Sequence, residues 1–204
     1  MSVALQEPPL TILPQVPGEP YRLSVEQYDQ MIRAGILAGP DRVELLEGRI
    51  VTRMTKNERH IASGKLVYRA LERLLPAGWH LAKDDPIVVP YSQPEPDLAV
   101  IRGAIRDYLE RHPGPRDVAL VVEISDSSLP NDRGTKKRIY ARAGIAAYWI
   151  VNLPAGRLEV SPGPAGTPEA PEYGARADLG PDDEVEVVID GQAVGKVAVR
   201  DLLP

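Results

Sequence analysis

Two carboxylates stand at the ends of apolar segments, where a charge is unusual. Glu123 ends the run 119–122, and Asp97 follows Pro96 and opens the run 98–101. A buried charge is costly unless another group compensates it. If the two runs are neighbouring strands, the carboxylates lie side by side and repel each other, which raises the pKa of one of them. A divalent cation would remove this repulsion, because hard cations prefer carboxylate and carbonyl oxygens. These residues therefore predict a cation site, most simply for Mg²⁺ that keeps several of its waters.

A basic partner for the two acids lies in the next segment of the chain. Lys136 falls within a predicted helix over residues 133–143, and Tyr140, four residues later, shares its face. A lysine held near the cation could orient an attacking water and stabilise the charge that develops on a phosphate. The neighbouring Lys137 could be the reaching residue instead.

Purely structural explanations stay open for each of these residues. Asp97 could simply begin a strand after a turn, and Lys136 could be a solvated helix charge. Glu123 could form a structural ion pair with Arg102 or Arg138. The pairing of two acids at strand ends nevertheless favours a functional site, because perturbed acids concentrate at such sites.

The elements that must position these residues follow one another as helix, three strands, helix and strand. Residues 57–75 show the strongest helical periodicity, and strands are predicted over 79–82 or 79–89, 97–101 and 118–124. The second helix begins after the N-cap candidates Asn131 and Asp132 and ends at Gly144. A buried strand at 146–152 completes this core. The order predicts an α/β fold with one mixed sheet flanked by helices.

Further elements are predicted on both sides of this core. Ser24 and Gln27 form a capping box for a short helix that ends near residue 34. Hairpins are predicted over 43–54, with a turn at Glu47-Gly48, over 146–161, and around Asp190-Gly191 near the end of the chain. Residues 102–117 are a short helix or a long loop, and residues 161–180 are a long loop. The five prolines within residues 1–20 predict a flexible arm, followed by a single domain over 21–204.

Composition narrows the class of protein. The chain has 204 residues, a net charge of −5 and no cysteine, which excludes a disulfide framework or a thiolate metal site. Its acidity counts against a protein that holds nucleic acid through phosphates alone. No apolar run approaches the ~18 residues that cross a membrane, and the first residues do not read as a signal peptide. We therefore expect a cytoplasmic protein that does not associate with membranes.

Two other motifs are set aside. The stretch GQAVGKV at Gly191 imitates a phosphate-binding loop, but it is one residue short and lacks Ser or Thr after Lys196. It also falls in a predicted hairpin instead of preceding a helix. The three histidines, His60, His80 and His112, lack zinc-ligand spacing, which disfavours a zinc hydrolase.

The segments ELLEGRIV, PEPDLAVIRG and LVVEISDSSLPNDRGTKKRIYARAGIAAYWIVN resemble the Uma-two family of endonucleases. That family is similar to the PD-(D/E)XK superfamily, whose fold is that of restriction endonucleases. The resemblance runs from about Tyr21 to the C-terminus and is most specific over 119–152. It implies an αβββαβ core with extra N- and C-terminal hairpins.

The resemblance also implies a set of site residues. Asp97, Glu123 and the Ile124 carbonyl would bind Mg²⁺ or Mn²⁺. Ser125 stands where the superfamily has its motif lysine, and Lys136 on the following helix would replace that lysine. Glu44 matches an acidic family position near the same site, although it could also be an exposed hairpin residue. His60 lies at a family position without a defined role, and could instead cap or pack the start of its helix.

The sequence thus predicts a metal-dependent endonuclease that hydrolyses DNA phosphodiester bonds, acting as a homodimer. An alternative is an inactive nucleic-acid- or protein-binding module of the same fold, which the acidic net charge and Ser125 favour. A third hypothesis is a metal-dependent hydrolase of small phosphate esters, which would have a closed pocket. Convergence of Asp97, Glu123 and Lys136 on one cleft is the geometric test of the first.

Overall fold

The computed structural model describes residues 18–37 and 42–204. The predicted arm over 1–20 lies almost entirely outside these residues. Within the described residues, no helix is long and apolar enough to cross a membrane.

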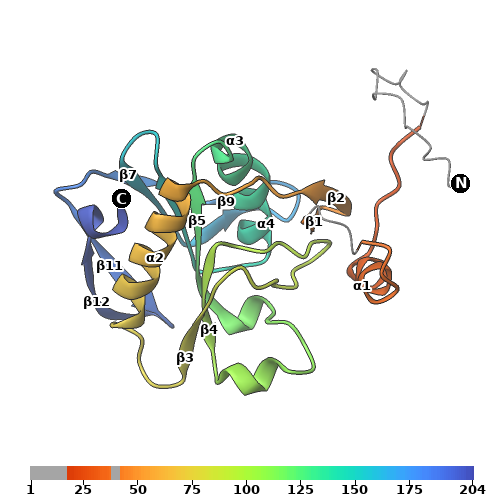
Figure 1. The fold of residues 1–204 in the computed structure, drawn as a ribbon, viewed down its shortest axis with the longest axis horizontal. Helices are drawn as coiled ribbons and strands as arrows, with labels where there is room; N and C mark the ends of the chain where they lie inside the picture. Colours follow the sequence, from red (N-terminus) through yellow and green to blue (C-terminus); the bar gives the residue numbers. More distant parts are fainter. Residues whose placement is uncertain (1–17, 38–41) are drawn as a thin grey trace, which may run out of the picture.

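A six-stranded mixed sheet forms the centre of the molecule (Figure 1), with the strand order β10-β7-β6-β5-β4-β3. Its central strand β5 pairs antiparallel with β4 and parallel with β6. The strands are β3 (Trp79–Ala82), β4 (Leu98–Arg102), β5 (Val118–Ser125), β6 (Ala147–Asn152), β7 (Arg157–Pro162) and β10 (Ala177–Leu179). The predicted mixed sheet flanked by helices is therefore confirmed.

The sheet is covered on both faces, so every residue of β5 is buried. Helix α2 (Glu58–Glu72) and the hairpin of β11 (Glu184–Ile189) and β12 (Gln192–Ala198) pack with one face. Helix α4 (Lys137–Arg142) packs with the other face, together with Ile87 and Val89. Strands buried on both faces read as continuous apolar runs, which explains the composition of residues 118–122.

Helix α2 approaches the sheet through small residues. Its buried side is formed by Ser63, Gly64, Val67 and Leu71, while Ile61 is 42% exposed. A Cβ atom added at Gly64 would lie 3.3 Å from the Ile124 side chain, so this glycine allows close packing on β5. The predicted helix is confirmed, and its contact with β5 at Gly64 is one that an apolar pattern does not reveal.

The second core helix begins earlier than the sequence predicts. It starts with α3 (Leu129–Asn131), continues as a π-helical turn η3 (Asp132–Lys136) and ends with α4. Gly144 follows with a positive φ of 75°, as predicted. Asn131 and Asp132 are not N-caps, because both lie within the helical segment. Single π turns often occur at functional sites.

The peripheral elements agree with the sequence except in one region. Helix α1 (Val25–Arg33) has the predicted capping box, and β1 (Val43–Leu46) pairs with β2 (Arg49–Thr52). Residues 102–117 contain two short 3₁₀ helices, η1 (Ile105–Tyr108) and η2 (Pro115–Asp117). The predicted loop over 161–180 is partly wrong, since it contains the short strands β8 (Pro164–Gly166), β9 (Pro171–Tyr173) and β10. A last 3₁₀ helix, η4 (Val199–Leu202), follows β12.

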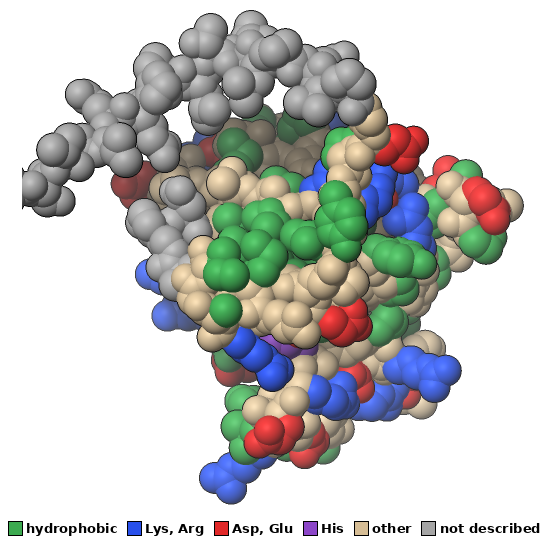
Figure 2. Space-filling view, turned by 90° about the vertical axis from the view of Figure 1, so that its right-hand side faces the viewer, with side chains coloured by type: hydrophobic (Ala, Val, Ile, Leu, Met, Phe, Trp, Pro, Cys, Tyr) green, Lys and Arg blue, Asp and Glu red, His purple; other side chains and the backbone are tan. Residues whose placement is uncertain are grey.

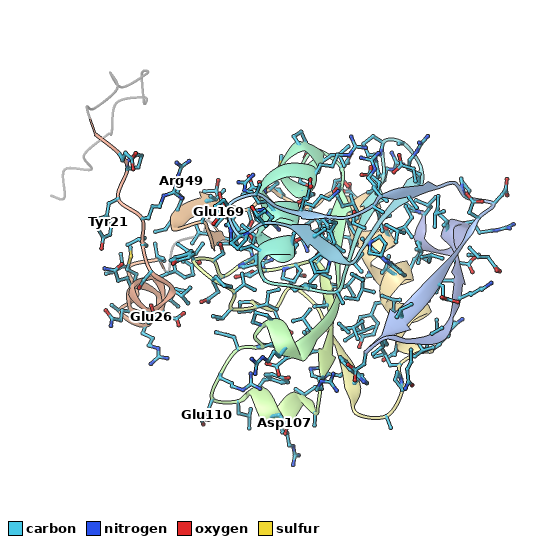
Figure 3. All side chains as sticks on the ribbon, turned by 180° about the vertical axis from the view of Figure 1, so that it is seen from behind. Tyr21, Glu26, Arg49, Asp107, Glu110 and Glu169 are labelled. Atoms are coloured by element: carbon cyan, nitrogen blue, oxygen red, sulfur yellow. The ribbon has the colours of Figure 1, made fainter. Side chains whose placement is uncertain are left out.

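Figure 3 shows α1, with Glu26, beside the sheet layers and not between them. Asp107 and Glu110 lie at the outer edge of the segment that connects β4 to β5. On the face turned toward the viewer in Figure 2, hydrophobic side chains gather across the middle, with charged side chains of both signs below them. The predicted site residues Asp97, Glu123 and Lys136 instead belong to β5 and the helix after it or directly precede β4, and these core elements position the predicted site.

Candidate functional site

The ladder between β4 and β5 brings the two predicted acids together. It ends at the pair Leu98 and Val122, so one further step of the same register sets Asp97 opposite Glu123. Both residues are buried, with exposed fractions of 7% and 3%. The Ile124 N–H donates a hydrogen bond of 2.8 Å to Asp97 Oδ2, which fixes the carboxylate at the strand end.

Lys136 and Tyr140 reach the same place from the helix. Lys136 Nζ donates a 3.0 Å hydrogen bond to Glu123 Oε1, and the Tyr140 hydroxyl donates one of 2.7 Å to the same oxygen. Both side chains are buried, as their shared helical face predicts. The alternative that Lys136 is a solvated charge is therefore wrong.

Glu44 joins this cluster from the β1–β2 hairpin. Its Oε2 lies 3.4 Å from Lys136 Nζ and accepts a 3.1 Å hydrogen bond from the Glu95 N–H. The side chain is 3% exposed, so the alternative of an exposed hairpin residue is wrong. Lys136 is thus held between two carboxylates from different strands.

The arginine pairings considered for Glu123 are also wrong. Arg102 pairs with Asp190, and Arg138 pairs with Glu47. Lys137 does not line the cleft that contains Lys136. Lys136 is therefore the basic residue that pairs with Glu123.

Asp97 has two further partners, one just before α2 and one in its first turn. Lys56 Nζ lies 2.6 Å from Asp97 Oδ1, and His60 Nε2 lies 3.1 Å from Asp97 Oδ2. The sequence singled out His60 only through a resemblance and gave no signal for Lys56. Lys56 lies in the irregular segment between β2 and the N-cap Asn57, where no periodicity indicates which way a side chain points.

Asp132 is a fourth buried acid of the site, and the sequence misread it as a helix cap. It is 2% exposed, and its Oδ2 accepts 2.6 Å hydrogen bonds from the hydroxyls of Ser125 and Ser128. Ser125 stands at the position where the resemblance in the sequence expects a lysine. Because its hydroxyl bonds Asp132, Ser125 anchors the π turn that carries Lys136.

The acidic and basic side chains of the site line one cleft with a volume of about 80 Å³. A water needs roughly 10–15 Å³ measured in this way, so the cleft has room for several waters or a hydrated cation. Its charged lining residues are the acids Glu44, Asp97, Glu123, Asp126 and Asp132 and the bases Arg53, Lys56 and Lys136, with His60 beside them. The five acids outnumber the three permanently charged bases.

The protonation of the central groups reflects this imbalance. Burial raises the pKa of Glu123 to about 8, because the nearby acids Asp132, Asp97 and Glu44 add to the effect and Lys136 offsets only part of it. Burial also opposes ionisation of Asp97, but hydrogen bonds and charge from His60 and Lys56 prevail and lower its pKa.

Burial would lower the pKa of Lys136, but the charges of Glu123, Glu44 and Asp132 prevail and raise it. The lysine therefore stays a cation.

The donor chemistry fits a hard divalent cation. Asp97 and Glu123 offer carboxylate oxygens, and the Ile124 carbonyl lies on the same side of β5 as its N–H, which bonds Asp97. Among the described residues, no three acids or histidines are grouped as a ready metal centre. Mg²⁺ commonly binds through one or two carboxylates plus waters, which agrees with this smaller donor set.

The mixed sheet and its cleft of carboxylates and lysines define an α/β protein with a charged cleft at the ends of two central strands. The family model described as "Uma2: Putative restriction endonuclease" matches residues 25–192, and the chain belongs to this family. In a search of solved structures, a crystal structure of "a putative nuclease belonging to DUF820" from Anabaena variabilis has a TM-score of 0.63. The similarity covers 88% of this chain and 97% of that chain, at 13% identity. No curated protein matches the sequence.

Proposed function

We propose that this protein hydrolyses phosphodiester bonds of DNA with the help of a divalent cation, Mg²⁺ or Mn²⁺. Asp97, Glu123 and the Ile124 carbonyl would hold the cation. Lys136 and Glu44 would complete the catalytic group. The observation that carries this proposal is the meeting of Asp97, Glu123 and Lys136 in one cleft that is open to solvent.

The residues of the cleft have separate tasks in this reaction. When bound, the cation supplies Lewis acidity toward the phosphate and the attacking water. Lys136, held by Glu123 and Glu44, orients the water and stabilises negative charge that develops on the phosphate oxygens. Tyr140 fixes Glu123, and His60 fixes Asp97, so neither carboxylate must reorganise during the reaction.

Cleavage of plasmid and oligonucleotide DNA at increasing Mg²⁺ or Mn²⁺ tests the proposal. We expect wild type to cleave only with the cation, and Asp97→Ala and Lys136→Met to lose at least about 100-fold in rate, the scale of removing one preorganised charge. Arg106→Met, an exposed residue of η1, is the matched control and should cleave as wild type does. Equal cleavage by wild type and Asp97→Ala would refute the assigned site.

Binding without cleavage is the second candidate function. It is favoured by Ser125, which replaces a motif lysine, and by the contacts of Lys56 and His60 with both oxygens of Asp97. It predicts DNA binding that is unchanged by Asp97→Ala, with no cleavage at any cation concentration.

The proposed partners are DNA and a second copy of the chain, and the proposed location is the cytoplasm. The hydrophobic side chains gathered on one face (Figure 2) support a homodimer, because contiguous apolar surface often marks an interface. Light scattering of the purified protein measures its mass and decides between monomer and dimer.

A further inference from the structure

Lys56 contacts Asp97, one of the carboxylates proposed to hold the metal ion. Its Nζ lies 2.6 Å from Asp97 Oδ1 and also contacts Asp84 Oδ1. The side chain is 22% exposed and lines the cleft from the segment between β2 and α2. One ammonium group therefore bridges two carboxylates from different parts of the chain.

The hydrogen bonds of Asp97 show which of its oxygens a metal ion could use. Oδ2 has the Ile124 N–H at 2.8 Å and His60 Nε2 at 3.1 Å. A carboxylate oxygen has two lone-pair positions, so these contacts fill Oδ2. Oδ1 is then the oxygen that remains for a metal ion, and it is the one that Lys56 contacts at 2.6 Å. A metal ion on Oδ1 would lie beside the ammonium group, and because like charges at this distance repel strongly, the two cations would compete for this oxygen.

Asp84 offers Lys56 a second partner that is already in place. It has a positive φ of 59°, a conformation that aspartate tolerates better than most residues. Arg53 lies 3.2 Å from the same Oδ1, and the Asp84 N–H donates a hydrogen bond of 3.4 Å to the Asp97 carbonyl. Burial opposes ionisation of Asp84, yet contacts with Lys56 and Arg53 lower its pKa. The carboxylate is thus charged and can hold Lys56 alone.

We propose that Lys56 occupies the cation position on Asp97 Oδ1 in the metal-free protein and moves entirely to Asp84 when a divalent cation binds. This inference rests on the proposed function, since it concerns the same cation. Without metal, the Lys56 ammonium group compensates the charges of Asp97 and Asp84. Asp84 lowers the cost of moving Lys56 away from Asp97, because Asp84 can hold Lys56 alone. Cation affinity is therefore set by Lys56 and Asp84, neither of which contacts the ion.

Binding of Mn²⁺ alone, followed by calorimetry and electron paramagnetic resonance, tests the inference without substrate. The variants are Lys56→Met, Asp84→Asn and the double variant, each compared with wild type. Lys83→Met, an exposed lysine next to Asp84 in the chain, controls for a general change in charge. Thermal unfolding with EDTA checks that each variant folds.

We expect Lys56→Met to bind Mn²⁺ about 10- to 100-fold more tightly, the range of one charge-assisted hydrogen bond. Asp84→Asn should bind more weakly than wild type. In the Lys56→Met background, the same Asp84 substitution should have less effect, because its role depends on Lys56. Lys83→Met should change affinity less than threefold.

Two results overturn the inference in different ways. If Lys56→Met and Lys83→Met have equal effects, or if the effects of Lys56→Met and Asp84→Asn are additive, Lys56 is not a competing cation, and the proposed metal site stands. If neither wild type nor Lys56→Met binds Mn²⁺, the metal site fails together with the inference.

Discussion

Glu123→Gln should change how the stability of the metal-free protein depends on pH. Burial raises the pKa of Glu123 in the folded protein to about 8, whereas in the unfolded chain this carboxyl has its ordinary pKa of 4.5. Protonation of Glu123 contributes stability to the folded protein, because the folded state binds the proton more tightly than the unfolded chain does. This stability is fully present below pH 4.5 and is lost as the pH rises through 8. Glutamine stays neutral and removes this dependence.

The size of the effect follows from the pKa difference. At about 1.4 kcal/mol for each pH unit between 4.5 and about 8, the full change approaches about 5 kcal/mol. At pH 7 the expected advantage of glutamine over wild type is about 3 kcal/mol. Both figures are upper bounds, because water in the cleft screens the charge.

Urea unfolding of wild type and Glu123→Gln in EDTA at pH 5, 6, 7 and 8 measures this difference. We expect the free energies of unfolding to converge at pH 5 and to separate steadily toward pH 8, with glutamine more stable. Glu110→Gln, an exposed acid at the outer edge of the molecule (Figure 3), should show no such trend. A constant difference between wild type and Glu123→Gln across this range would refute the reasoning that burial raises the pKa of Glu123.

The remaining predictions concern the elements that hold the site. Gly48→Ala should destabilise the protein by about 1–3 kcal/mol more than Gly78→Ala in urea unfolding. Both glycines have positive φ, but only a Cβ at Gly48 would lie 2.7 Å from the Arg22 side chain. Equal losses would show that the contact of this hairpin with Arg22 is not tight. Tyr140→Phe should cost about 1–3 kcal/mol in the same assay, since it removes the 2.7 Å hydrogen bond to Glu123. No loss would show that the hydroxyl does not support the carboxylate.

Much of the framework of the site was readable from the sequence because it depends on local patterns. The apolar runs identify β4 and β5, and the strand ends identify Asp97 and Glu123 as neighbours. The four-residue spacing of Lys136 and Tyr140 places them on one helical face, and both contact Glu123. These inferences need only strand and helix periodicity.

The partners of Asp97 were less accessible for a physical reason. Lys56 comes from an irregular segment, and its contacts with Asp84 and Asp97 join residues far apart in the chain. Strand periodicity also stops before Asp84, whose positive φ belongs to a turn. Only the packing of α2 against the sheet brings these residues together, and that packing depends on Gly64, which an apolar pattern does not reveal.

Asp132 explains how a lysine can serve the site from the helix. The sequence pattern of Asn131 and Asp132 is that of a cap, but a cap is exposed, whereas Asp132 is 2% exposed. Because the Ser125 hydroxyl and the Tyr148 hydroxyl both bind Asp132, the π turn is fixed to β5 and β6. Ser125 at the end of β5 thus holds in place the turn from which the Lys136 ammonium group reaches Glu123.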